Sequence, residues 1–189
     1  MKNNTTSTNK NGSKVYRPLM ALAIGLSIFL SCSKSVEDGP QILSEMEING
    51  QTYGLGGGIL IDWEEVNNGS ADYDLVLYSE GIVINQEGQP ENAGSFILFD
   101  LNSYAPASFE GGTFTFSNER QPGTISGAFL VTDYSGDPNS IPNAIYIASG
   151  NVDVTLNGGL YTVNFTLTTI DGDAVSGTYI GELPEQSNN

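Results

Sequence analysis

The fold class is decided by the stretch Val152-Asp153-Val154-Thr155-Leu156-Asn157-Gly158-Gly159-Leu160-Tyr161-Thr162-Val163-Asn164-Phe165-Thr166-Leu167. Apolar residues alternate with polar ones on both sides of Asn157-Gly158-Gly159, at even positions before the glycines and at odd positions after them. A period of two is that of a β-strand, and Asn and Gly supply the positive φ of a tight turn. Only a loop with an even number of residues brings both apolar sets to one face. We therefore predict a two-residue hairpin in which Val154 faces either Val163 or Tyr161.

The same alternation recurs along most of the chain after residue 41. A second hairpin is predicted at Asn49-Gly50, between Ile42–Ile48 and Gln51–Leu55. Further strands are predicted at Gly58–Asp62, Tyr73–Tyr78, Gly81–Asn85, Phe96–Leu101, Thr113–Ser117, Gly127–Val131, Ala144–Ser149 and Val175–Ile180. Because no segment beyond the N-terminal region has a sustained helical period, we predict a single all-β domain, an antiparallel sandwich or barrel of about 8–11 strands.

The N-terminal region has the layout of a bacterial export signal. Twelve residues from Leu19 to Leu30 are mostly apolar, and Ser31 and the single cysteine of the chain, Cys32, follow them. No acidic residue precedes Glu37, and the basic residues before the apolar run are Lys2, Lys10, Lys14 and Arg17. Charge, apolar run and small residue in that order are typical of a signal peptide. A membrane-spanning helix is the less favoured alternative, since it needs about 20 apolar residues.

Phe29-Leu30-Ser31-Cys32 resembles a lipobox, in which a small residue precedes a lipid-modified cysteine. The commonest form has Leu three residues before the cysteine, where this chain has Phe29. The resemblance implies cleavage before Cys32 and a lipid on its sulfur, with the protein anchored to the bacterial outer membrane. The polar tether that follows favours the cell-surface face over the periplasmic face. The expected organisation is a signal peptide over 1–31, lipidated cysteine and tether over 32–40, the β domain over 41–185 and a disordered tail over 186–189.

The composition excludes several classes of function. Cleavage before Cys32 would remove four of the six basic residues and leave two of them, Lys34 and Arg120, against 22 acidic ones, a formal charge of −20. Such a domain repels nucleic acid, whose binding depends on basic side chains. The chain has no histidine, which excludes a Ser-His-Asp triad and a histidine-based metal site. With its only thiol lipidated, the domain has no disulfide, and we predict that it is not an enzyme. A carboxylate-dependent glycoside hydrolase is the one enzymatic alternative.

Two kinds of residue are candidates for ligand binding. Trp63, in Asp62-Trp63-Glu64-Glu65, is the weak candidate for a ligand contact, because a Trp beside carboxylates at a strand end can stack on a sugar ring; the alternative is an ordinary core or rim aromatic. No cofactor is expected, although calcium accepts oxygen ligands of the kind offered by two acidic turns. These weak calcium candidates are Asp171 and Asp173, and Asp133 and Asp137. Arg120 is predicted to be a solvated loop charge.

The C-terminal third carries a resemblance. Its motifs are Ser149–Val154, Tyr161–Phe165 and Asp171–Tyr179, with Glu110–Thr115 upstream. Together they resemble the C-terminal antiparallel hairpins of small Bacteroidota lipoproteins. The resemblance implies a β domain and an envelope location, and no catalytic residue.

These observations predict a lipid-anchored envelope protein that acts as a binding or accessory module for a glycan or a protein partner. The alternative is a calycin-like carrier of a small apolar ligand. An exposed Trp63 would favour the first function, and an enclosed apolar cavity would favour the second.

Overall fold

The computed structural model describes residues 44–104, 108–137 and 143–187, with the backbone alone at 65–67. The predicted signal peptide and tether, with Cys32, lie outside these residues. The compact unit Gly39–Asn189 contains every described strand and both hydrophobic clusters found among the described residues, so it holds its own core.

The described residues form strands and turns without a helix, which confirms the all-β prediction. The strands are β1 (Glu45–Ile48), β2 (Gln51–Gly54), β3 (Gly57–Asn67), β4 (Ser70–Tyr78), β5 (Val83–Ile84), β6 (Pro90–Glu91), β7 (Gly94–Ser103), β8 (Gly112–Phe116), β9 (Thr124–Tyr134), β10 (Ile145–Asn157), β11 (Leu160–Thr169), β12 (Ala174–Gly181) and β13 (Glu185–Ser187). None of the described segments is a helix able to cross a membrane. The described residues contain thirteen strands, more than the 8–11 predicted, because the short strands β6 and β13 carry no alternating pattern to reveal them.

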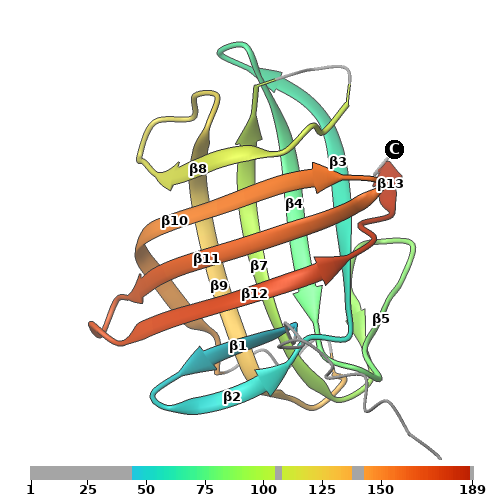
Figure 1. Cartoon of the computed structure of the whole chain (residues 1–189), viewed down its shortest axis with the longest axis vertical. Helices are drawn as coiled ribbons and strands as arrows, with labels where there is room; N and C mark the ends of the chain where they lie inside the picture. Colours follow the sequence, from blue (N-terminus) through green and yellow to red (C-terminus); the bar gives the residue numbers. More distant parts are fainter. Residues whose placement is uncertain (1–43, 105–107, 138–142, 188–189) are drawn as a thin grey trace, which may run out of the picture. The chain divides into compact units, whose positions relative to one another are not determined.

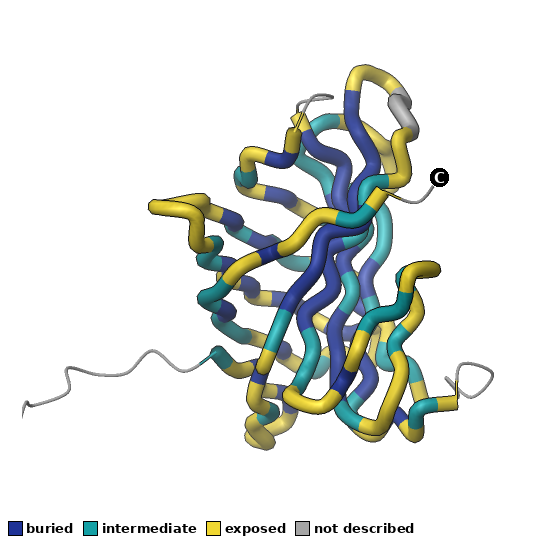
Figure 2. Tube along the Cα trace, turned by 90° about the vertical axis from the view of Figure 1, so that its right-hand side faces the viewer, coloured by how far each residue is buried: buried dark blue, intermediate teal, exposed yellow. Residues whose placement is uncertain are grey.

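Eleven of the strands form one curled sheet in the order β13-β3-β4-β7-β9-β8-β10-β11-β12-β1-β2, and β5 pairs with β6 separately. In Figure 1, β3, β4, β7 and β9 run along the long axis behind, while β8, β10, β11 and β12 cross in front of them. The sheet thus folds over itself, and its two halves pack face to face with crossed strands. Figure 2 shows buried residues along the strands of these layers and exposed residues mostly in the connecting loops.

Both predicted hairpins are confirmed. In the first, Val154 pairs with Val163, one of the two registers expected, and Gly158-Gly159 forms the two-residue loop between Asn157 and Leu160. Both glycines have positive φ, at 62° and 88°, as the turn that matches the twist of a hairpin requires. In the second, Asn49 and Gly50 have φ of 54° and 74° and join the paired residues Ile48 and Gln51.

The prediction of an antiparallel domain is wrong at two pairings, so the sheet is mixed. β8 runs parallel to β9 through Thr115↔Thr124 and Phe116↔Ile125, and β13 runs parallel to β3. Alternation in the sequence reports which face a residue lies on and not the direction of its neighbour strand, so it could not show these pairings. The predicted tail boundary is also wrong, because Gln186 and Ser187 belong to β13.

The core lies in two places. The larger hydrophobic cluster fills the space between the layers and includes fully buried side chains such as Phe99, Phe114 and Leu75. The second cluster, with Ile61, Val76 and Phe96, lies on the other face of β3, β4 and β7. Ile82 and Ile84 of the β5–β6 segment pack on this second cluster. We call this face of β3, β4, β7 and β9 the outer face. Its remaining part carries the polar residues described next.

Candidate functional site

The strand order around β9 creates an opening in the sheet. On one side, β9 pairs with β8 at residues 124–125 and with β10 at residues 129–130, and no pairing joins residues 126–128 to either strand. β10 behaves likewise: residues 145–146 pair with β9 and residues 151–154 with β8. The three strands therefore diverge around a gap. Backbone N–H and C=O groups on the facing sides of this gap have no strand neighbour to bond, which makes them available to a ligand.

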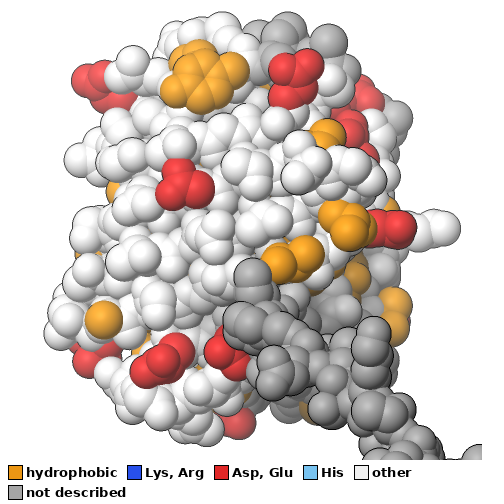
Figure 3. Space-filling model, viewed as in Figure 1, with side chains coloured by type: hydrophobic (Ala, Val, Ile, Leu, Met, Phe, Trp, Pro, Cys, Tyr) orange, Lys and Arg blue, Asp and Glu red, His pale blue; other side chains and the backbone are white. Residues whose placement is uncertain are grey.

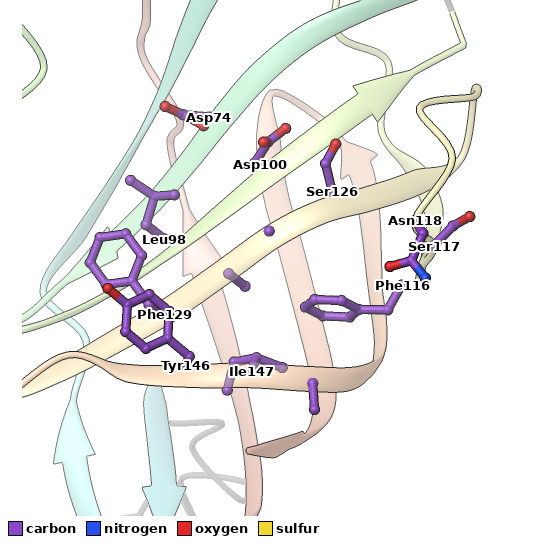
Figure 4. A pocket seen from close by; sticks show the side chains of 13 residues that line it. Asp74, Leu98, Asp100, Phe116, Ser117, Asn118, Ser126, Phe129, Tyr146 and Ile147 are labelled. Atoms are coloured by element: carbon purple, nitrogen blue, oxygen red, sulfur yellow. The ribbon is translucent and has the colours of Figure 1, made fainter. Parts of the chain in front are cut away.

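A hollow of about 700 Å³ fills this gap and is open to solvent; we call it the fork hollow. Its size is that of a typical small-ligand site. Its lining comes from Asp74, Leu98 and Asp100 on β4 and β7, Ser126, Gly127, Ala128 and Phe129 on β9, Phe116, Ser117 and Asn118 at the end of β8, and Tyr146, Ile147 and Ala148 on β10. Figure 4 shows Asp74, Asp100 and Ser126 together at one end, with Phe129 and Tyr146 side by side farther along. The hollow thus has a polar end and an aromatic wall.

Trp63 lies beside this polar end. The pairing of β3 with β4 is interrupted between Asp62 and Val66, where Glu64 has a φ of 53° and its N–H donates to Asp62 Oδ1 at 2.7 Å. The interruption places Trp63 on the surface, where the residue is 40% exposed. Its indole Nε1 donates to Asp74 Oδ2 at 2.9 Å. Trp63 is therefore an exposed aromatic held in one orientation, and its carboxylate partner is Asp74 of β4 and not the adjacent acids of its own segment.

Arg120 joins the carboxylates of two strands. The residue lies between β8 and β9, and its guanidinium contacts Asp72 Oδ2 at 2.7 Å and Asp100 Oδ2 at 3.2 Å. Arg120 is thus an ion-pair partner, which corrects the prediction of a solvated loop charge. A second hollow of about 280 Å³ is lined by Trp63, Asp72, Asp74, Asp100 and Arg120. Because Asp74 and Asp100 line both hollows, the two hollows adjoin, and we treat them together as one candidate site.

The negative charge of the three carboxyl groups in this site is only partly balanced by positive charge. Burial raises the pKa of Asp74 to about 6; the nearby Asp100 and Asp72 carboxyls also raise it, against the hydrogen bond from Trp63. The pKa of Asp72 is raised as well, first by burial and then by Asp100, although Arg120 opposes both. Asp100 Oδ1 is buried and has no hydrogen-bond partner among the described residues. A single guanidinium therefore compensates three carboxyls only in part.

The calcium candidates lie elsewhere. Asp171-Gly172-Asp173 forms the turn between β11 and β12, in which the Asp173 N–H donates to Thr169 Oγ1 at 3.0 Å. Asp133 is an exposed residue of β9, and Asp137 is exposed just after that strand. Over the described ranges, no three Asp, Glu, Cys or His side chains gather as metal ligands. Calcium binding at these positions stays a prediction.

The sequence contained a partial signal for the residues that it did not single out. Asp72, Asp74 and Asp100 occupy even positions in strands whose odd positions are apolar, which places them on one face. Their neighbours across the sheet, and the reach of Arg120, depend on register and on loop path. Comparison with known proteins found no matching family model and no similar curated protein or solved structure.

Proposed function

We propose that the chain is a lipid-anchored lipoprotein of the bacterial outer membrane whose β domain is a non-enzymatic binding module for carbohydrate. Lipid on Cys32 would hold the domain at the membrane, with the cell-surface face favoured. The observation that carries the binding proposal is the exposed indole of Trp63, which is fixed by Asp74 at the edge of an open polar hollow.

The chemistry of the site suits a sugar. A pyranose ring presents an apolar face that stacks on an aromatic ring, and its hydroxyls donate to carboxylates. Trp63 and Tyr146 supply exposed rings, at 40% and 56% exposure, and Asp74 supplies an acceptor between them. The space between the sheet layers is filled by the larger hydrophobic cluster, and both hollows of the site open to solvent. This arrangement favours an open carbohydrate site over an enclosed apolar one.

The same contacts argue for binding without hydrolysis. Glycoside hydrolysis needs two carboxyl groups that are free to act on either side of the bond. Within the two hollows, Asp72 and Asp100 are bound to Arg120, which leaves Asp74 as the carboxyl outside that ion pair.

Replacing Trp63 tests the carbohydrate proposal. The unit Gly39–Asn189 should bind a subset of glycans on an array, and Trp63→Ala should weaken that binding at least about tenfold, because truncating a Trp that anchors a binding site typically costs about 2 kcal/mol or more. Leu156→Ala is the matched control, since Leu156 is 48% exposed at the distant end of β10. Equal binding by the Trp63→Ala and Leu156→Ala variants would contradict the proposal.

Replacing Cys32 tests the anchor. The wild-type chain should incorporate radiolabelled palmitate in bacterial cells, and Cys32→Ala should abolish the label, because no other cysteine is present. Label that persists in the variant would refute lipidation at Cys32. Proteinase added to intact cells should degrade a surface-displayed domain, and survival would place it on the periplasmic face.

A further inference from the structure

We propose that the fork hollow selects carbohydrates that carry a protonated amine, with the ammonium group at Asp74 and Asp100 and the sugar ring against Phe129 and Tyr146. This inference rests on the proposed carbohydrate function and names the class of sugar. It follows from three independent features of the site: its charge, its shape and its unsatisfied hydrogen-bonding groups.

The charge of the site is negative. Asp72, Asp74 and Asp100 meet one cation, Arg120, so the fully ionised cluster has a formal charge of −2. None of the thirteen residues that line the fork hollow is basic. On the face drawn in Figure 3, acidic side chains are scattered and no Lys or Arg is visible among the described residues, in line with the acidic composition. An anionic sugar, such as a uronic acid, would be repelled, while an ammonium group would be attracted.

The shape of the hollow separates a place for the cation from a place for the ring. Figure 4 shows the carboxyl ends of Asp74 and Asp100 near Ser126, and the rings of Phe129 and Tyr146 along the same wall. The Phe129 and Tyr146 rings lie with centroids 6.1 Å apart at 48°. Tyr146 is 56% exposed, so its ring remains open to a partner. A flat apolar body with a cationic substituent matches this arrangement, since aromatic faces also attract cations.

The hydrogen-bond acceptors of the site outnumber the donors that reach them. Asp100 Oδ2 accepts from Arg120, whereas Asp100 Oδ1 is buried without a partner. Asp74 accepts from Trp63 through Oδ2. The edges of β9 and β10 at residues 126–128 and 147–150 have no strand neighbour within the gap. An ammonium group brings three donors and no acceptor, which is the complement that carboxylates require. The raised pKa of Asp74 has the same origin, a shortage of positive charge.

Calorimetric titration with two oligosaccharides of equal length tests the inference. The probes are chitosan tetramer, which carries free amines, and chitin tetramer, in which each amine is acetylated and neutral. For Gly39–Asn189 at pH 6.5, we expect the chitosan tetramer to bind at least about tenfold more tightly. Asp100→Asn and Asp74→Asn should each remove most of this preference. Glu47→Gln, an equal loss of charge at an exposed position of β1, should retain it.

The outcomes separate this inference from the proposed function. Equal affinity for both tetramers, or binding of neutral glycans alone, would overturn the amine preference and leave carbohydrate binding standing. A preference that survives in both Asp variants would also overturn it, because the attraction would then arise from the overall charge. Tighter binding of tetralysine than of chitosan would assign the site to a protein partner and overturn both. Thermal unfolding verifies that each variant is folded. If Asp100→Asn proves unstable, Asp74→Asn still tests the inference, because the oxygen of its amide keeps an acceptor for the Trp63 indole.

Discussion

Gly150→Ala is expected to destabilise the protein by more than about 3 kcal/mol, a large fraction of the stability of a domain. Gly150 has a φ of 129°, outside the range of residues with a side chain. A Cβ atom there would lie 2.3 Å from the Thr166 carbonyl oxygen and 2.6 Å from Leu167 Cα. Both atoms belong to the backbone of β11, which is paired on both sides and cannot move away without breaking its ladders. The residue lies just beyond the register shift of β10 between Ile147 and Ser149.

Urea unfolding of Gly39–Asn189 measures this effect, and Gly159→Ala is its matched control. Gly159 also has positive φ, at 88°, but a Cβ atom there would meet nothing within 4 Å. The control should therefore show the conformational cost alone, about 1 kcal/mol. Similar losses in the two variants would mean that the close approach of β10 and β11 at Gly150 does not constrain the fold.

Asp74→Asn is expected to stabilise the protein at pH 8 by about 1–2 kcal/mol. The pKa of Asp74 is raised from 3.8 to about 6 in the folded protein, so the folded state binds the proton more tightly than the unfolded state does. The contribution of the Asp74 proton to the free energy of unfolding therefore grows as the pH falls from about 6 to 3.8. At pH 8 the carboxyl is ionised and this contribution is absent. The full shift corresponds to about 3 kcal/mol, which partial exposure to solvent reduces. An amide is neutral at every pH and still accepts from Trp63.

The effect of Asp74 on stability is measured as the difference in unfolding free energy between wild type and Asp74→Asn, at pH 8 and at pH 4. We expect the advantage of the variant at pH 8 to disappear at pH 4, with no such change for Glu47→Gln. Trp63, the single tryptophan, should report the same event in its fluorescence, with a transition near pH 6 that is absent in Asp74→Asn. A wild-type stability that falls from pH 8 to pH 5, relative to the variant, would have the wrong sign and would contradict the assignment.

The sequence predicted the fold where local chemistry determines it. The loops at Asn49-Gly50 and Gly158-Gly159 were found because they require positive φ, and parity restricted the register of Val154 to two choices. The parallel strand β13 was missed because three residues carry no usable period. The division of β10 between two neighbour strands was missed for another reason: Gly150, with a φ of 129°, lies between the two paired segments, but a glycine marks a bend and does not identify the strand on either side of it.

The candidate site was predicted only in part, for the same reason. Trp63 was named as a weak candidate for a ligand contact beside the alternative of an ordinary core or rim aromatic; the structure places it at the surface, and ligand binding by Trp63 stays a prediction. Its partner Asp74 lies 11 positions away in sequence, and strand pairing brings Asp100, 37 positions away, beside Asp74. The fork hollow has no sequence signature, because it consists of positions where three strands do not pair.

The pairing of β1 with β12 and of β3 with β13 has a consequence for how the protein folds during and after synthesis. β1 joins the sheet only through β12 and β2, and β3 completes its outer edge only with β13, where Ser187 Oγ donates to Glu64 Oε1 at 2.7 Å. During synthesis, β1 and β3 can pair early with β2 and β4, but their second neighbours, β12 and β13, are made only after most of the sheet. These pairings join residues far apart in the sequence, such as Glu45 and Thr178, and long-range pairing of this kind folds slowly. A chain that folds slowly stays unfolded for longer, which is compatible with the export that we propose for this protein.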